Sequence, residues 1–173
     1  NLGRLHFKAG NFSAAATSLE RALELDPFYL AAKVNLGLLQ QRSGRLDAAL
    51  QTFREALDLD PDYAPALNNL GLAHAEGGRL EEGIAALRQA LSLAPENRAA
   101  QVNLQLLELE RQGVSPGAAY EQLLQRFPAR RELWKALGDL RARQESWAAA
   151  VAAYERALEL GPEEVQILAS LAA

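Results

Sequence analysis

Apolar and polar positions divide residues 30–63 into two amphipathic helices. In residues 31–43, Leu36, Gly37 and Leu39 recur at helical spacing and form one apolar face. Apolar residues recur at helical spacing in residues 46–59 as well and form a second apolar helix face. Gly44 separates the two helices because glycine accepts the left-handed backbone of a C-terminal cap, and Pro61 ends the second because proline cannot continue a helix interior. The segment therefore predicts a pair of antiparallel helices.

The same pattern recurs along the whole chain. Residues 64–97 align with residues 30–63, so that Leu70-Gly71 matches Leu36-Gly37 and Gly78-Arg79-Leu80 matches Gly44-Arg45-Leu46. Successive copies are about 34 residues long, which is a repeat-array period. Prolines close these copies, at Pro27, Pro61, Pro95, Pro128 and Pro162. Because one helix pair cannot bury its apolar faces alone, we expect the copies to stack.

These motifs resemble those of the tetratricopeptide repeat (TPR) family. The resemblance rests on Asn-Leu-Gly early in the copy, a Gly-Arg-Leu turn, small Ala49, aromatic Phe53, Ala56-Leu57 and Asp60-Pro61. It implies an all-α fold, a right-handed superhelical solenoid of stacked antiparallel helix pairs with about five repeats and partial ends. It also implies that the first helices line a concave side. The resemblance does not name a function, because this scaffold carries many functions.

We expect one array over residues 1–173. Its parts are a truncated first repeat (1–29), a second (30–63), a third (64–97), a degenerate fourth (98–130), a fifth (131–164), and residues 165–173 as the start of a sixth repeat or a capping helix. In the fourth copy Gln105 replaces the mid-helix glycine. Ser115 as an N-cap before Pro116 predicts a second helix that starts late and is short.

Glycines lie inside the first helices at Gly3, Gly37, Gly71 and Gly138, each at a cost of about 1 kcal/mol relative to alanine. Close approach of the paired helix offsets this cost, with Ala15, Ala49 and Ala149 as the expected small partners. Trp147 and Tyr154 are expected in the core of the fifth copy.

Composition narrows the chemistry further. The chain has no cysteine, which excludes disulfides, thiol catalysis and cysteine metal sites. The two histidines, His6 and His74, occupy equivalent places two copies apart, so they do not converge on one site and are expected to pack between helices. No phosphate-binding glycine loop or nucleophile elbow is present. We therefore expect no enzyme within this sequence and no cofactor.

Charge is distributed unevenly along the chain. Residues 111–143 contain 7 basic and 3 acidic residues, whereas residues 1–110 contain 10 basic and 14 acidic, and residues 144–173 contain 1 basic and 5 acidic. A nucleic-acid surface would need such a patch together with stacking aromatics or a known motif, so the basic stretch is interpreted as a solvated face of a repeat and no nucleic acid is expected. No apolar run approaches the roughly 20 residues of a membrane helix, so no membrane insertion is expected.

The one recurrent polar feature is a series of asparagines before Leu-Gly or Leu-Gln, at Asn1, Asn35, Asn69 and Asn103. Their helical spacing places each asparagine on the same helix face as a leucine. These faces, on successive first helices, form a predicted peptide-binding groove. Its residues are Ala31, Asn35, Leu38 and Arg42, then Pro65, Asn69 and Leu72, then Ala99, Asn103 and Leu106. In the fifth copy the ladder stops at Ala136, and Lys135 and Asp139 make the groove charged.

An amide offers a donor and an acceptor, so such a ladder suits a peptide backbone whatever its side chains. The series is similar to the asparagine ladder in the TPR arm of O-linked N-acetylglucosamine transferase. Asparagine at this place is also frequent among TPR sequences, so a role in contacts within the fold is the alternative. Neighbouring groove positions hold Val34, Asn68 and Val102, and Lys135 stands alone, which argues against a clamp for a chaperone C-terminus.

The expected function is a protein–protein interaction scaffold that binds an extended or helical peptide segment. The alternatives are the substrate-targeting arm of a larger enzyme, such as a glycosyltransferase, and a self-assembling structural protein. A homodimer through exposed repeat ends is a further expectation. The chain begins and ends inside expected helices, so we expect an excerpt of a longer array. A bacterial source and a cytoplasmic location are favoured, although the sequence names neither.

Overall fold

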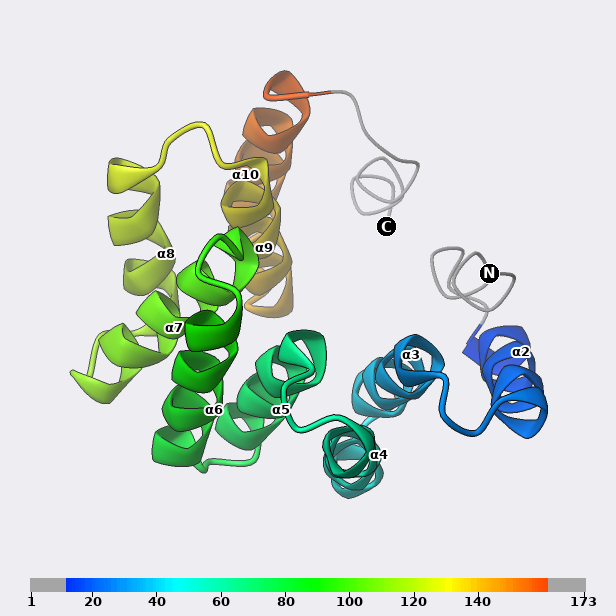
Figure 1. Ribbon diagram of the computed structural model, residues 1–173. Helices are drawn as coiled ribbons and strands as arrows, with labels where there is room; N and C mark the ends of the chain where they lie inside the picture. Colours follow the sequence, from blue (N-terminus) through cyan, green and yellow to red (C-terminus); the bar gives the residue numbers. More distant parts are fainter. Residues whose placement is uncertain (1–11, 162–173) are drawn as a thin grey trace. The chain divides into compact units, whose positions relative to one another are not determined.

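The computed structural model describes residues 12–161, and this part of the chain is all helical, without strands (Figure 1). The prediction of an all-α repeat solenoid is confirmed. The helices are α2 (Phe12–Leu25), α3 (Leu30–Arg42), α4 (Leu46–Leu59), α5 (Ala64–Glu76), α6 (Leu80–Leu93), α7 (Arg98–Arg111), α8 (Pro116–Arg126), α9 (Arg131–Arg143) and α10 (Trp147–Glu159). Asn1, Gly3, His6 and residues 165–173, for which the sequence made predictions, lie outside the described residues.

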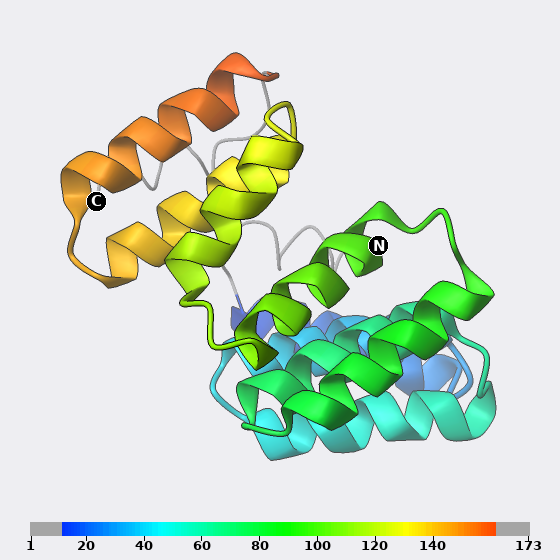
Figure 2. The ribbon, with the colours of Figure 1, turned by 90° about the vertical axis from the view of Figure 1, so that its left-hand side faces the viewer.

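The chain divides into two compact units, Asn1–Leu107 and Glu108–Ala173, and the boundary falls within α7. In unit 1, α3 pairs with α4 and α5 pairs with α6, as the second and third copies predict (Figure 1). In unit 2, α9 pairs with α10, and Figure 2 shows this antiparallel hairpin in orange. The predicted single array over residues 1–173 concerns both units together and stays a prediction.

Glycines with positive φ form the turns between paired helices in the second and third copies. Gly44 has φ of 73° and Gly78 has φ of 75°, which is the left-handed conformation that the cap requires. The equivalent residue of the fifth copy is Glu145, with φ of 58°. A side chain in this conformation is unfavourable because Cβ comes too close to the backbone carbonyl. The fifth copy therefore keeps the turn geometry without the residue that suits it.

We expect Glu145→Gly to raise the free energy of unfolding of unit 2 by about 1 kcal/mol, because relief of the left-handed strain exceeds the extra backbone entropy of glycine. Chemical denaturation followed by circular dichroism measures this change. The matched control is Gln144→Gly, one residue earlier, where φ of −88° gives glycine no advantage. Equal effects of the two substitutions would contradict the strain argument.

In the second and fifth copies, a glycine of the first helix faces a large aromatic side chain of the second helix. Phe53 is 0 % exposed, and a Cβ atom added to Gly37 would lie 2.4 Å from its ring. Gly138 faces Tyr154 in the same way, with a distance of 2.6 Å from the added Cβ to the ring. The predicted close approach of paired helices is therefore confirmed, and the atoms that approach Gly37 and Gly138 most closely are aromatic.

In the third copy the approach is between two glycines. A Cβ atom on Gly83 would lie 2.7 Å from the backbone oxygen of Gly71, so the α5 and α6 backbones are in direct contact. Ala15 and Ala49 are buried, but the atoms nearest to a Cβ added at Gly37 belong to Phe53 and not to the expected small partner Ala49. Ala149 is exposed, and its neighbour Ala150 is the buried residue, so the prediction for Ala149 was wrong by one position.

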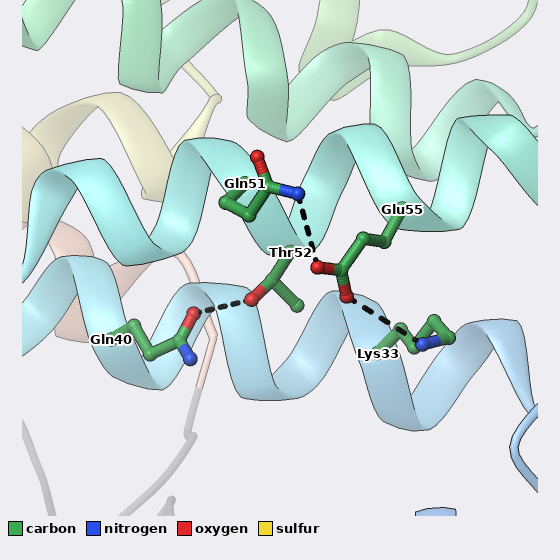
Figure 3. Close-up of polar contacts among 5 residues, drawn as sticks. All are labelled: Lys33, Gln40, Gln51, Thr52 and Glu55. Carbon is green, nitrogen blue, oxygen red and sulfur yellow. Dashed lines mark hydrogen bonds and ion pairs between the residues drawn. The ribbon is translucent and has the colours of Figure 1, made fainter.

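Polar contacts add to the apolar pairing of α3 and α4 (Figure 3). The hydroxyl of buried Thr52 donates a hydrogen bond of 2.7 Å to Gln40 Oε1. Lys33 Nζ lies 3.8 Å from Glu55 Oε2 near the other end of the pair, and Gln51 donates to Glu55 Oε1 over 3.1 Å. The Thr52 contact satisfies a buried hydroxyl, which would otherwise carry a desolvation cost.

In unit 2, α8 is the shortest described helix, with 11 residues. It begins at Pro116 after Ser115, which confirms the predicted late start, although Ser115 makes no side-chain cap hydrogen bond. Tyr154 is buried as predicted, but Trp147 is 60 % exposed, so its assignment to the core was wrong. The equivalent residue of the second copy, Leu46, packs against the core shared with the following copy. For Trp147 the following copy lies outside the described residues.

Candidate peptide-binding surface

The predicted groove residues of unit 1 lie on three successive first helices, and none of their side chains is buried. Arg42, Pro65 and Ala99 are exposed, and the remaining residues are half-buried. We call this set the first-helix surface; it comprises Ala31, Asn35, Leu38 and Arg42 of α3, Pro65, Asn69 and Leu72 of α5, and Ala99, Asn103 and Leu106 of α7. All of its residues are therefore accessible for contact within this unit.

Amide contacts connect the first helices to one another. Asn103 of α7 donates from Nδ2 to Asn68 Oδ1 of α5 over 3.0 Å. Gln41 of α3 donates from Nε2 to Glu76 Oε2 of α5 over 2.5 Å. In both pairs the partners are 35 residues apart, which is about one repeat plus one residue. The three helices thus lie side by side, and these pairs were not predicted from the sequence.

The predicted asparagine ladder is partly bonded within the protein. Asn69 Nδ2 donates 2.8 Å to Pro65 O on its own helix, and Asn68 Nδ2 lies 3.5 Å from Asn69 Oδ1. Together with the Asn103 contact, this makes a chain of three amides across α5 and α7. The Asn35 side chain makes no hydrogen bond within residues 12–161. The three asparagines therefore lie on one surface, but Asn69 and Asn103 already form hydrogen bonds within the protein and Asn35 forms none among the described residues.

We expect Asn68→Val to change the free energy of unfolding by less than about 1 kcal/mol, because the lost hydrogen bond is partly exposed and valine fills the same place in the second and fourth copies, at Val34 and Val102. The substitution leaves the Asn103 amide without its partner on α5. Chemical denaturation measures the stability, and side-chain amide NMR signals report the released group. A loss of several kcal/mol would show that the amide chain is a core element of unit 1.

The leucines of the first-helix surface are partly buried in the fold. Leu38 is half-buried and packs against the core cluster that includes Val34 and Phe53. Leu72 and Leu106 are half-buried as well. A partner would therefore contact the exposed part of Leu38 while its other side remains in the core. Such anchored side chains lose little further freedom on binding.

Lys135 and Asp139 belong to unit 2 and form a contact network of their own. Lys135 Nζ lies 2.9 Å from Asp139 Oδ2, and the Tyr154 hydroxyl donates 2.8 Å to Asp139 Oδ1. Asp139 therefore connects α9 to α10, and it pairs with Lys135 one turn earlier on its own helix. The predicted groove residues thus fall into a largely uncharged set in unit 1 and an ion pair in unit 2, and the structure describes the two sets separately.

His74 is buried at the end of α5 and serves the fold. Its Nδ1 accepts a hydrogen bond of 2.9 Å from Arg79 Nε in the turn to α6. Burial lowers the pKa of His74 below its usual 6.5, and the positive charges of Arg79 and Arg54 lower it further. His6 lies outside the described residues. The expectation of a packing role therefore agrees with the surroundings of His74.

The lowered pKa of His74 makes stability depend on pH. Because the folded state resists protonation that the unfolded chain accepts, stability should fall as pH drops below about 6.5. We expect His74→Gln, the residue present at the equivalent Gln40, to weaken this dependence. Thermal melts of both proteins, recorded from about pH 8 to about pH 5 so that they bracket the histidine titration, provide the measurement. Parallel pH profiles of the two proteins would contradict the assignment.

Within the described residues, no cluster of three or more acidic or histidine side chains has the geometry of a metal site. The helices between residues 12 and 161 include none that is long and apolar enough to cross a membrane.

Comparison with known proteins identifies the repeat family. The family model described as tetratricopeptide repeat matches residues 1–64, 34–98 and 104–165. No match was found among curated proteins. Among solved structures, a thermophilic TPR protein of Thermus thermophilus, TTC0263, is similar with a TM-score of 0.71 and 24% identity, over 99% of this chain and 94% of that chain.

Two further solved structures are similar to part of this chain. An O-GlcNAc transferase mutant from Thermobaculum terrenum is similar with a TM-score of 0.62 and 28% identity, over 72% of this chain and 24% of that chain. The first TPR of Spaghetti (RPAP3), bound to the HSP90 peptide SRMEEVD, has a TM-score of 0.59 at 23% identity, over 64% of this chain and 87% of that chain. The family model covers most of the sequence, and this chain therefore belongs to the tetratricopeptide repeat family.

Proposed function

We propose that this chain is a non-catalytic protein-interaction scaffold whose first-helix surface in unit 1 binds a peptide segment. Asn35, Asn69 and Asn103 contact the backbone of the peptide, and Leu38, Leu72 and Leu106 pack against its apolar side chains. TPR domains typically act as interaction scaffolds, and the RPAP3 domain is an example with a bound peptide. The observation that carries the proposal is the recurrence of one amide and one leucine, accessible on each of three adjoining helices.

The amide contacts indicate what the peptide must supply. One N–H of Asn69 and one of Asn103 are already donated within the protein. The Asn103 oxygen and both functions of Asn35 make no hydrogen bond within the described residues, so acceptor capacity remains along the surface. A backbone N–H group of the partner matches this capacity. The stripe carries no charge except at Arg42, which favours a partner segment with uncharged, apolar side chains.

The experiment is affinity capture from cell lysate with the wild type and with Asn35→Ala/Asn69→Ala/Asn103→Ala. The control variant is Gln51→Ala/Gln89→Ala/Gln125→Ala, which removes three exposed amides from the second helices. We expect a partner that the asparagine variant loses and the control keeps, with similar thermal melts for the three proteins. A partner retained by the asparagine variant would contradict the proposal, and a lower melting temperature of that variant alone would assign the asparagines to the fold.

A second candidate is the substrate-targeting arm of a larger enzyme. It is favoured by the similarity to the O-GlcNAc transferase, of which this chain covers 24%. In that case the same surface would present a protein substrate to a catalytic domain elsewhere in the polypeptide. The gene sequence tests this candidate: a glycosyltransferase domain next to the repeats supports it, and flanking repeats alone contradict it.

A further inference from the structure

One turn between copies differs in charge from the equivalent turns. The α8–α9 turn has Arg126 and Arg130 within two residues of Pro128, and Arg131 follows. The charged residues equally close to the other four prolines are all acidic, namely Asp26, then Asp60 and Asp62, then Glu96, and then Glu163 and Glu164. Phe127 occupies the place held by Asp26 and Asp60 in the first two copies. The sign of the charge is therefore inverted at this turn alone among the five aligned positions.

Phe127 holds two of these arginines close together. The guanidinium carbon of Arg126 lies 5.2 Å from the ring centroid of Phe127, and that of Arg130 lies 5.0 Å from the same centroid. The two positive charges are thus within roughly one Debye length, about 10 Å, of each other. Stacking on a ring restricts the orientation of a guanidinium group, whose N–H edge is the part that binds an anion. The turn therefore presents two restricted cationic groups.

The acidic residues of the same region are engaged with other basic side chains. Glu121 contacts Arg141 at 2.5 Å, Asp139 contacts Lys135 at 2.9 Å, and Glu132 lies 3.7 Å from Arg131. Arg126 forms no ion pair with an acidic residue of the described chain. The excess positive charge of residues 111–143 is consequently not neutralised at Arg126 by the carboxylates of its own stretch.

The backbone of the turn is fixed from the following helix. Trp134 Nε1 donates a hydrogen bond of 2.9 Å to Pro128 O, and Arg156 of α10 lies over the Trp134 ring at 5.9 Å. The arginine pair is therefore built on an anchored turn. Its indole anchor also provides a fluorescent reporter beside the cationic groups.

We propose that the α8–α9 turn is a second recognition site, which binds an acidic peptide segment through Arg126 and Arg130. Carboxylates match the planar, bidentate donor geometry of guanidinium groups. A single-stranded nucleic acid fits less well, because base stacking needs open aromatic faces and two guanidinium groups already lie over Phe127. This site is in unit 2 and uses none of the residues of the first-helix surface.

The test uses the full chain and a fluorescein-labelled hexaglutamate peptide, with binding followed by fluorescence anisotropy at low salt. We expect Arg126→Ala/Arg130→Ala to weaken binding about tenfold or more, because two charge-assisted contacts are lost. The control is Arg45→Ala/Arg54→Ala, which removes the same charge from exposed sites of unit 1 and should change binding less than about twofold. Equal weakening by both variants, or none by the first, would overturn the proposal.

Two further variants test the chemistry of this site and its independence from the first-helix surface. Arg126→Lys/Arg130→Lys keeps the charge but loses the planar stacking group, so binding should fall; wild-type affinity would show that charge alone suffices and overturn the guanidinium assignment. The Asn35→Ala/Asn69→Ala/Asn103→Ala variant should bind hexaglutamate like the wild type, so failure of the first-helix proposal leaves this one intact. Tighter binding of an oligothymidylate through the same arginines would overturn the peptide assignment.

The same series of variants includes a control for correct folding. Thermal melts are recorded for each variant, and Arg126→Gln/Arg130→Gln replaces the alanine pair if that pair melts earlier, since glutamine keeps polar volume without charge. In a Trp147→Phe background, Trp134 is the one remaining tryptophan of the sequence and its emission should change on addition of hexaglutamate. Unchanged emission together with unchanged anisotropy would exclude binding at this turn.

Discussion

Replacing Phe53 by alanine should lower the free energy of unfolding of unit 1 by about 3–5 kcal/mol, the range for removing a fully buried aromatic side chain. Phe53 is 0 % exposed and belongs to the cluster that joins α3, α4 and α5. The ring also fills the space above Gly37, which has no side chain of its own to close the resulting cavity. Urea denaturation followed by circular dichroism measures the change.

Phe28→Ala is the matched control, because the same ring is removed from a side chain that is 71 % exposed. We expect a change within about 0.5 kcal/mol there, as for surface substitutions in general. Similar losses from the two substitutions would show that Phe53 does not occupy the core between α3 and α4.

The second large effect is expected from Gly83→Ala, which should destabilise unit 1 by about 1–3 kcal/mol through overpacking. Alanine gains about 1 kcal/mol of helix propensity over glycine, so the contact must outweigh this gain. The new Cβ atom would lie 2.7 Å from the Gly71 oxygen and 3.1 Å from Leu107 Cδ1, and the first of these atoms is backbone that cannot rotate away. Chemical denaturation and thermal melts measure the result.

Gly117→Ala in α8 is the control for helix propensity without a clash. The nearest atom to its added Cβ is an Arg141 guanidinium nitrogen at 3.6 Å, an ordinary contact distance. This substitution should be neutral or stabilising by up to about 1 kcal/mol. If Gly83→Ala behaves in the same way, α5 and α6 are not as closely packed as the Gly71–Gly83 contact indicates.

The repeat pattern predicted most helix positions because short-range signals determine them. Gly44 and Gly78 marked the turns through their left-handed backbone, and Pro116 marked the late start of α8. These effects depend on the residue itself and its neighbours along the chain. The burial of Phe53 and Tyr154 followed from helical periodicity in the same way.

Features that depend on the next copy were predicted less well. Trp147 was assigned to the core from its place in the repeat, yet it is 60 % exposed, whereas the equivalent Leu46 packs against the core that its copy shares with the next one. The bonds from Asn103 to Asn68 and from Gln41 to Glu76 depend on which positions of adjoining helices face each other. In the sequence, both pairs are marked by a separation of 35 residues, one more than the repeat length. The type of residue at a single position does not reveal this pairing.

The central claim is that a peptide binds to the first-helix surface, and hydrogen–deuterium exchange tests it most directly. A peptide selected against the wild-type chain from a random display library is added, and exchange is compared with and without it. We predict protection in α3, α5 and α7, with little change in α4 and α6, and loss of this protection in Asn35→Ala/Asn69→Ala/Asn103→Ala. Protection confined to the second helices or the turns, or unchanged in the variant, would contradict the claim.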